Sequence, residues 1–148
     1  MDRRQPDVGA GGLSDMPKVG DVARRSRTIE SADIERFSAM TGDHNPLHYD
    51  EAVAAASPFG RVIVQGGVTS GLLNAVVAED LPGPGSVFLN VNWDFKAGVG
   101  PGDTITAEVE VTAVREDKPI TTLRTTITDQ DGTVVLDGTA VVYTVPVG

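Results

Sequence analysis

The sequence predicts an α+β fold in which a curved antiparallel sheet wraps around one buried helix. Two patterns carry this prediction. Residues 87–95 and 105–113 alternate apolar and polar side chains with a period of two, which is typical of half-buried antiparallel strands. Residues 66–80 are apolar on most faces, as expected of a helix that the rest of the protein encloses.

The first half of the chain contributes a strand and two short helices before the buried helix. Residues 22–29 suit a polar strand at the edge of a sheet, because three of them are arginines. Ser31 has the chemistry of a helix N-cap, and Gly42 ends that helix. Asp50 is expected to cap a second, alanine-rich helix over residues 51–56.

The second half is expected to form a meander of four strands. These strands cover residues 87–95, 105–113, a segment around 123–127, and 134–142. The pair Asp131-Gly132 is a hairpin signal between the last two strands.

Length and composition indicate one globular domain. The chain has 148 residues, of which 40% are hydrophobic and 22% are charged, an ordinary balance for such a domain. Residues 1–16 contain almost nothing to bury, so we expect a disordered tail there and a single domain over residues 17–148.

Charge and residue usage exclude several kinds of partner. A formal net charge of −9 opposes nucleic-acid backbones and anionic membranes, so neither is an expected partner. No apolar run approaches the roughly 20 residues of a membrane span. The absence of cysteine excludes disulfides and favours a reducing, cytoplasmic setting. With only two histidines, a metal site is not expected.

Asp43 and His48 are the first candidates for chemistry. They stand five residues apart with Pro46 between them, a spacing that a turn brings to one point. A carboxylate beside an imidazole is a usual acid/base pair and would polarise one water. On local chemistry alone, a plain proline turn in which Asp43 bonds its own backbone is favoured over an acid/base pair. His44 is read as exposed, pointing away from Asp43.

Gln65-Gly66-Gly67 is the second candidate. Two glycines that open a buried helix expose backbone N–H groups where the helix dipole favours negative charge. Such donors suit a carbonyl oxygen that gains charge during a reaction. Glycine at this place equally serves close packing. Farther along the same helix, Ser70 and Asn74 share a face.

The segment Phe37-Ser-Ala-Met-Thr-Gly-Asp-His-Asn-Pro-Leu-His48, followed by Ala52, resembles the signature of the MaoC-like (R)-specific enoyl-CoA hydratases. That signature is an aromatic residue, a few small or apolar residues, Gly-Asp-x-Asn-Pro, an aliphatic residue, histidine and a small residue. The similarity extends from about Val19 to Tyr143.

The resemblance implies a hot-dog fold and a hydro-lyase of fatty-acid metabolism. It implies Asp43 and His48 as the catalytic pair, which would add water to a trans-2-enoyl-CoA to give the (R)-3-hydroxyacyl-CoA, or reverse this. Asn45 would orient the loop, and the Gly66 N–H would bind the thioester carbonyl. A homodimer, a coenzyme A or acyl-carrier-protein thioester as substrate, and no metal or other cofactor complete the expectation.

Two positions depart from the family pattern. Many relatives carry histidine at Gln65, and a glutamine holds a hydrogen bond but does not titrate. Asn74 stands where relatives carry a small hydroxyl residue that lines the site, so both residues are expected at the substrate.

Three alternatives stay open beside CoA-thioester hydration. The first is a 3-hydroxyacyl-carrier-protein dehydratase of fatty-acid or polyketide assembly. The second is a non-catalytic hot-dog subunit that binds acyl thioesters, although such a subunit would be expected to lose Asp43 or His48. The third is a thioesterase, for which Glu79 at the far end of the helix is badly placed.

Overall fold

The computed structural model describes residues 16–147. Of the predicted N-terminal tail, all but Met16 therefore lies outside the described residues. The elements, in chain order, are β1 (Val22–Thr28), α2 (Ser31–Thr41), the 3-10 helix η1 (Pro46–His48), α3 (Glu51–Ala56), α4 (Gly66–Glu79), β2 (Ser86–Phe95), β3 (Thr104–Val114), β4 (Ile120–Thr128) and β5 (Val134–Thr144).

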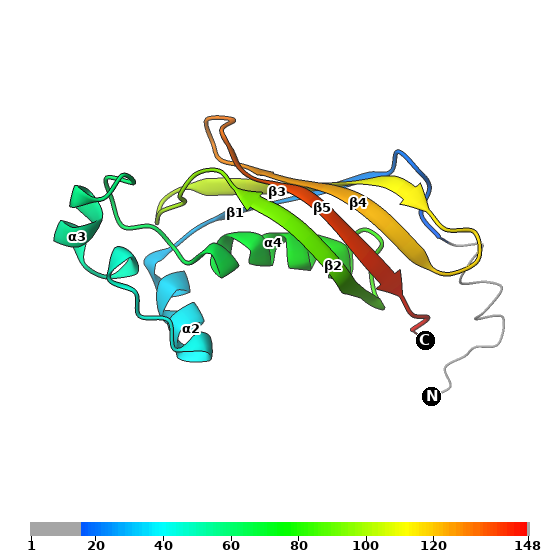
Figure 1. The fold of residues 1–148 in the computed structure, drawn as a ribbon, viewed down its shortest axis with the longest axis horizontal. Helices are drawn as coiled ribbons and strands as arrows, with labels where there is room; N and C mark the ends of the chain where they lie inside the picture. The colour runs from blue at the N-terminus through cyan, green and yellow to red at the C-terminus, as the bar shows by residue number, and fades with distance from the viewer. Residues whose placement is uncertain (1–15, 148) are drawn as a thin grey trace.

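One five-stranded sheet curves over α4, while α2, η1 and α3 lie together at one end of the molecule (Figure 1). The strand order is β1-β3-β4-β5-β2, and every neighbouring pair is antiparallel. This arrangement confirms the predicted α+β, hot-dog architecture.

The predicted four-strand meander is wrong for its first strand. Only β3, β4 and β5 follow one another across the sheet, whereas β2 pairs with β5 at the far edge and β1 takes the place beside β3. Alternation along a strand tells which side chains face the core, but it holds no information about which strand lies alongside.

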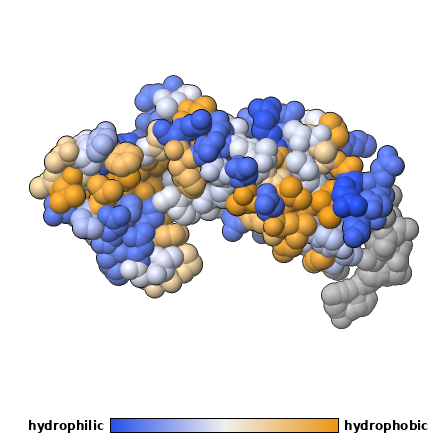
Figure 2. Space-filling model, viewed as in Figure 1, coloured by the Kyte–Doolittle hydropathy of each residue, from blue (hydrophilic) through white to orange (hydrophobic). Residues whose placement is uncertain are grey.

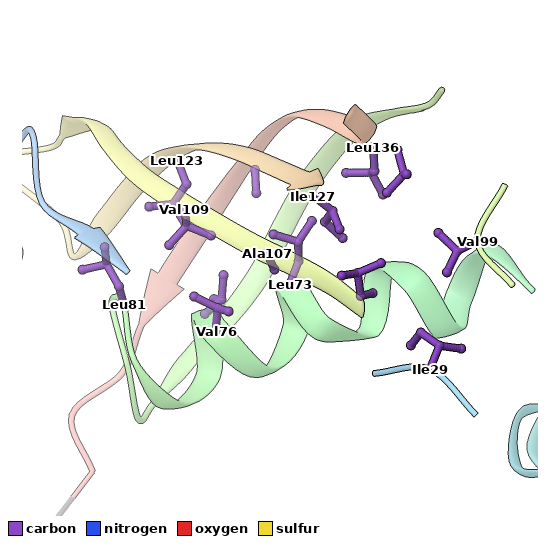
Figure 3. Close-up of a cluster of buried hydrophobic side chains, with 14 of the residues drawn as sticks. Ile29, Leu73, Val76, Leu81, Val99, Ala107, Val109, Leu123, Ile127 and Leu136 are labelled. Carbon is purple, nitrogen blue, oxygen red and sulfur yellow. The ribbon is translucent and has the colours of Figure 1, made fainter. Parts of the chain in front are cut away.

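The core forms where α4 meets the inner face of the sheet. Leu73 and Val76 on α4 are fully buried against the inward side chains of β3, β4 and β5 (Figure 3). Those inward side chains include Val109, Leu123 and Leu136. The helix is apolar on several faces because the sheet curves around it.

Bulges in β2 and β3 shift the side chains that the simple alternation predicts to be inside. In β2 the pairing register jumps between Phe88 and Asn90, so Phe88 packs against the core while Val87 and Leu89 stay exposed. In β3 the jump leaves Ala113 exposed. A bulge inserts one unpaired residue and therefore reverses the inside–outside pattern beyond it.

Helix boundaries follow the predicted capping residues with one exception. Gly42 ends α2 in the left-handed conformation, and the Asp50 carboxylate caps α3 by accepting the amides of Ala52 and Val53. The N-cap of α2 is Glu30 rather than Ser31, because the Asp33 carboxylate accepts the Glu30 amide at 2.9 Å and starts the helix one residue earlier.

Candidate active site

Asp43 and His48 come together at the junction of α2 and η1. Asp43 Oδ1 accepts the amide of Asn45 at 3.1 Å, and Asn45 Oδ1 in turn accepts the amide of Leu47 at 3.1 Å. These two bonds turn the chain back and open η1, which carries His48. The second carboxylate oxygen, Oδ2, lies 3.9 Å from His48 Nε2.

His48 is held in one orientation by a backbone carbonyl. Its side chain is 9% exposed, and its Nδ1 lies 2.7 Å from the carbonyl oxygen of Ile63. A carbonyl only accepts, so Nδ1 carries the hydrogen and the neutral ring presents a lone pair at Nε2. The 3.9 Å between Nε2 and Asp43 Oδ2 exceeds a direct hydrogen bond and suits one bridging water.

His48 lies on the wall of a largely apolar cavity of about 270 Å³. Gly66, at the first position of α4, lines the same cavity. A side chain at Gly66 would place its Cβ 3.1 Å from the ring of Phe95, so the glycine leaves the helix terminus open to the cavity. The other lining residues are Phe59, Ile63, Val64, Thr69, Phe95, Lys96, Ala97, Gly98 and Val99.

Gly67 has a different task from Gly66. A Cβ at Gly67 would overlap the ring of Phe37 on α2, so this glycine permits the close packing of α2 against α4. Both interpretations of the glycine pair therefore apply, one to each residue. Gly66 lines the cavity, and Gly67 allows α2 and α4 to pack closely.

Residues 16–132 match the family model for the MaoC like domain. The chain belongs to the MaoC-like family.

Curated relatives and solved structures agree with this membership. The MaoC-like chain is 46% identical to the (R)-specific enoyl-CoA hydratase of Aeromonas caviae over 125 residues, which are 84% of this chain and 93% of that protein. It is 39% identical to the 3-hydroxybutyryl-CoA dehydratase of Methylorubrum extorquens, over 84% of this chain and 79% of that protein. The solved structure of the (R)-hydratase from A. caviae superimposes with a TM-score of 0.82 at 45% identity, covering 86% of this chain and 97% of that one.

Gln65 and Asn74 lie away from the cavity wall in this MaoC-like chain. Gln65 is 2% exposed, and its Nε2 donates to Ile34 O at 3.3 Å and to Ser38 Oγ at 3.1 Å. Asn74 is exposed on α4. Neither is among the described residues that line the cavity, so their contact with substrate stays a prediction.

Two polar residues next to Asp43 and His48 were not predicted from the sequence. Ser38 is buried on α2, and its hydroxyl donates to the Asp43 carbonyl at 2.6 Å. Tyr49, which follows His48, donates its hydroxyl to Ser38 and stacks on the ring of His44. His44 is exposed, as predicted. The available signal was the helical spacing of four between Ile34 and Ser38, which puts both on the buried face of α2.

A carboxylate clamp centred on Asp103 holds the loop that includes Val99. Asp103 accepts hydrogen bonds from Arg61, from the Gly100 amide at 3.0 Å and from Gln130 at 3.0 Å. Burial opposes ionisation of Asp103, but the bonds from Arg61, Gly100 and Gln130 together hold the pKa of its carboxyl below the usual value. The clamp fixes the backbone next to Val99, which lines the cavity.

Within residues 16–147, no three or more histidine, cysteine, aspartate or glutamate side chains gather in a way that would hold a metal ion. No helix in the same range has the length and apolar character needed to cross a membrane.

Proposed function

We propose that this protein catalyses the reversible hydration of trans-2-enoyl-CoA to (R)-3-hydroxyacyl-CoA, as a hydro-lyase. The observation that carries the proposal is the placement of His48. Its Nδ1–H is committed to a carbonyl, its Nε2 lies 3.9 Å from Asp43 Oδ2, and its ring forms part of an apolar cavity. The two relatives described above are named for this reaction and for its reverse.

Asp43 and His48 share the activation of one water. The water bridges Nε2 and Oδ2, and the neutral imidazole accepts one of its protons as the oxygen bonds to C3 of the enoyl thioester. The electrons of the C2–C3 double bond move toward the thioester carbonyl, and C2 then takes up the proton that the imidazole received, which returns His48 to its neutral form. One O–H bond and one π bond break while C3–O and C2–H bonds form. Water is the only co-reactant, so the reaction requires no cofactor beyond the CoA of its substrate.

The start of α4 stabilises the charge that develops on the thioester oxygen. The first amides of a helix have no partner within it, and the helix dipole favours negative charge at this end. The Gly66 N–H, on the cavity wall that it shares with His48, is the donor in this proposal. One such donor contributes about 3–4 kcal/mol to a transition state. Asn45 supports the pair by forming the turn between them.

The active unit in this proposal is a homodimer joined along β2. This strand is an edge of the sheet, and its side chains of Val87, Leu89 and Phe95 are 53%, 55% and 55% exposed. Figure 2 shows hydrophobic residues gathered on the face where β2 runs in Figure 1. Exposed apolar edges favour pairing with a further strand. Phe95 also lines the His48 cavity, so a second copy at this edge would close the site.

Parallel assays of crotonyl-CoA test the proposed function. Loss of the enoyl absorbance would follow hydration, and a free-thiol reagent would follow thioester cleavage. We expect hydration without thiol release, with (R)-3-hydroxybutyryl-CoA as the product. Thiol release without hydration would establish a thioesterase, and neither signal would favour the non-catalytic binding subunit.

The same assay with crotonyl-acyl-carrier protein separates the two carriers. A higher kcat/KM for the CoA thioester supports the proposed substrate. A strong preference for the carrier protein would instead assign the chain to the dehydratases of fatty-acid or polyketide assembly.

A further inference from the structure

One hydroxyl group joins three segments of the site. Ser38 Oγ donates to the Asp43 carbonyl oxygen at 2.6 Å and accepts hydrogen bonds from the Tyr49 hydroxyl and from Gln65 Nε2, the latter at 3.1 Å. A serine hydroxyl has one hydrogen and two lone pairs, so these contacts use its full bonding capacity. Ser38 is 3% exposed, which leaves water little access to replace any of them.

Each partner of Ser38 adjoins a group that the proposed reaction needs. Asp43 supplies the carboxylate, and Tyr49 directly follows His48 in the chain. Gln65 directly precedes Gly66 and is the N-cap of α4. The Ser38 hydroxyl therefore connects the three chain segments that carry the Asp43 carboxylate, the His48 imidazole and the Gly66 amide.

The orientation of the Gln65 amide makes it a donor to Ser38. Its Nε2 also lies 3.3 Å from the Ile34 carbonyl oxygen, which only accepts. Exchanging the amide nitrogen and oxygen would set two acceptors against each other. Gln65 Oε1 is buried without a hydrogen-bond partner among residues 16–147. The bonds that hold this buried amide are therefore those of its Nε2.

We propose that Ser38 is a positioning residue that sets the spacing of Asp43, His48 and the Gly66 amide through this single hydroxyl. The inference rests on the hydratase function proposed above. Its physical basis is the 3.9 Å between Nε2 and Oδ2, which one water bridges only if both side chains hold their places. A misplacement of about 1 Å at a reacting group costs on the order of 100-fold in rate.

Kinetics of Ser38→Ala and Tyr49→Phe test the inference. We expect Ser38→Ala to lower kcat roughly 10- to 100-fold with KM for crotonyl-CoA nearly unchanged, since orientation and not substrate affinity is lost. Ser57→Ala is the matched control, because it removes another serine hydroxyl that donates to a backbone carbonyl, that of Ala54. The control should keep the parent kcat.

The double variant Ser38→Ala/Tyr49→Phe adds a second criterion. Because the Tyr49 hydroxyl acts through Ser38, the double variant should match Ser38→Ala alone. Losses that multiply would show independent contributions and overturn the proposal. If Ser38→Ala does not fold, Tyr49→Phe removes one of the three bonds and should give a smaller fall in kcat at unchanged KM. An unchanged kcat in that variant would equally overturn it.

A substrate-free measurement separates this inference from the proposed function. The chain has two histidines, so ¹⁵N spectra of the imidazole rings in a His44→Gln background report His48 alone. We expect Ser38→Ala, but not Ser57→Ala, to shift the His48 ring signals. A folded Ser38→Ala protein with unchanged His48 signals would overturn the positioning role. If Ser38→Ala shifts the His48 ring signals but the parent protein does not hydrate crotonyl-CoA, the proposed reaction is overturned and the positioning of His48 by Ser38 is supported.

Discussion

At the scale of single residues, the two oxygens of Asp43 do different work. Oδ1 accepts the Asn45 amide and shapes the turn, while Oδ2 faces the imidazole of His48 at 3.9 Å. The two readings that the sequence left open, a structural turn and an acid/base pair, are therefore compatible. The hydrogen bond that Oδ1 accepts in the turn orients the carboxylate so that Oδ2 points toward His48.

Removing either member of the pair should stop catalysis without unfolding the protein. We expect Asp43→Asn and His48→Gln each to lower kcat by about 100-fold or more, the scale of a lost acid/base group. His44→Gln is the control, because that ring is exposed and is not among the described residues that line the cavity. Steady-state rates with crotonyl-CoA, beside circular dichroism, measure the effect. Near-parental rates in both folded variants would refute the assigned roles.

The neighbouring glycines should respond differently to an added methyl group. Gly67→Ala drives a Cβ into Phe37 and should destabilise the fold by about 1–3 kcal/mol. Gly66→Ala meets Phe95 at 3.1 Å on the cavity wall and should mainly raise KM. Urea unfolding and steady-state kinetics of the two variants measure these effects. Equal losses of stability would contradict the division between packing and site.

At the scale of elements, the position of β2 decides the shape of the site. Within residues 16–147 this strand pairs with β5 alone, and it ends in Phe95, which lines the cavity. Gly138 on β5 faces Trp93 on β2 with φ of 151°, and a Cβ there would overlap the Asn92 carbonyl. The close approach of the two strands therefore depends on this glycine.

Gly138→Ala should loosen β2 far more than a substitution at a second glycine that also has a positive φ. Gly132, in the hairpin before β5, has φ of 81° with open space around its Cβ position. We expect Gly132→Ala to cost about 1–2 kcal/mol from backbone strain alone. Gly138→Ala adds a steric clash to strain, so its loss in urea unfolding should be clearly larger, with faster hydrogen exchange in β2. Similar losses for both would argue against a tightly apposed β2.

At the scale of the whole molecule, the edge strand and the acidic surface act together. A net charge of −9 keeps copies apart in general, while the exposed apolar side chains of β2 provide one place for a specific contact. The proposed dimer would bury that edge and complete two cavities at once.

Dimer formation along β2 should fail when its edge carries a charge. Light scattering of the parent is expected to give twice the 15.5 kDa mass of one chain. Leu89→Lys places a cation on the exposed edge and should shift the mass toward one chain, with lower kcat/KM. Val53→Lys is the control, because Val53 is 43% exposed on α3, outside β2. A parent of single-chain mass would contradict the proposed dimer.

Acid should destabilise the fold through two buried carboxylates. Burial opposes ionisation of Asp33, but the hydrogen bonds from the Glu30 amide, Arg27 and Arg36 outweigh it and lower the pKa of its carboxyl. The bonds from Arg61, Gly100 and Gln130 lower the pKa of Asp103 in the same way. Their stabilising contribution is present above the unfolded pKa, about 3.9, and is lost as pH falls through the lower folded values. Urea unfolding between pH 7 and pH 3 should show this loss. In Asp103→Asn the free energy of unfolding should fall less steeply with decreasing pH than in the parent. Equal slopes would exclude a contribution from Asp103.

Local chemistry explains how much of the fold was predictable. Asp50 and Gly42 delimit their helices through caps that act within four residues, and 105–111 alternate as a regular strand requires. The bulges in β2 and β3 were not predictable, since an unpaired residue arises from the fit of a strand to its neighbour. Ser38 was missed because its hydrogen-bond partners are up to 27 residues away in the chain.

The sequence by itself determined the element types, the turn at Asp43–His48 and the apolar helix, because caps, periodicity and proline turns act over a few residues. Only the tertiary structure decided the strand order, the separate tasks of Gly66 and Gly67, and the orientation of His48. These depend on contacts between distant segments, such as the Ile63 carbonyl that fixes His48 Nδ1. The residue types of the site are therefore evident from a short stretch of sequence, whereas their geometry depends on packing between distant segments.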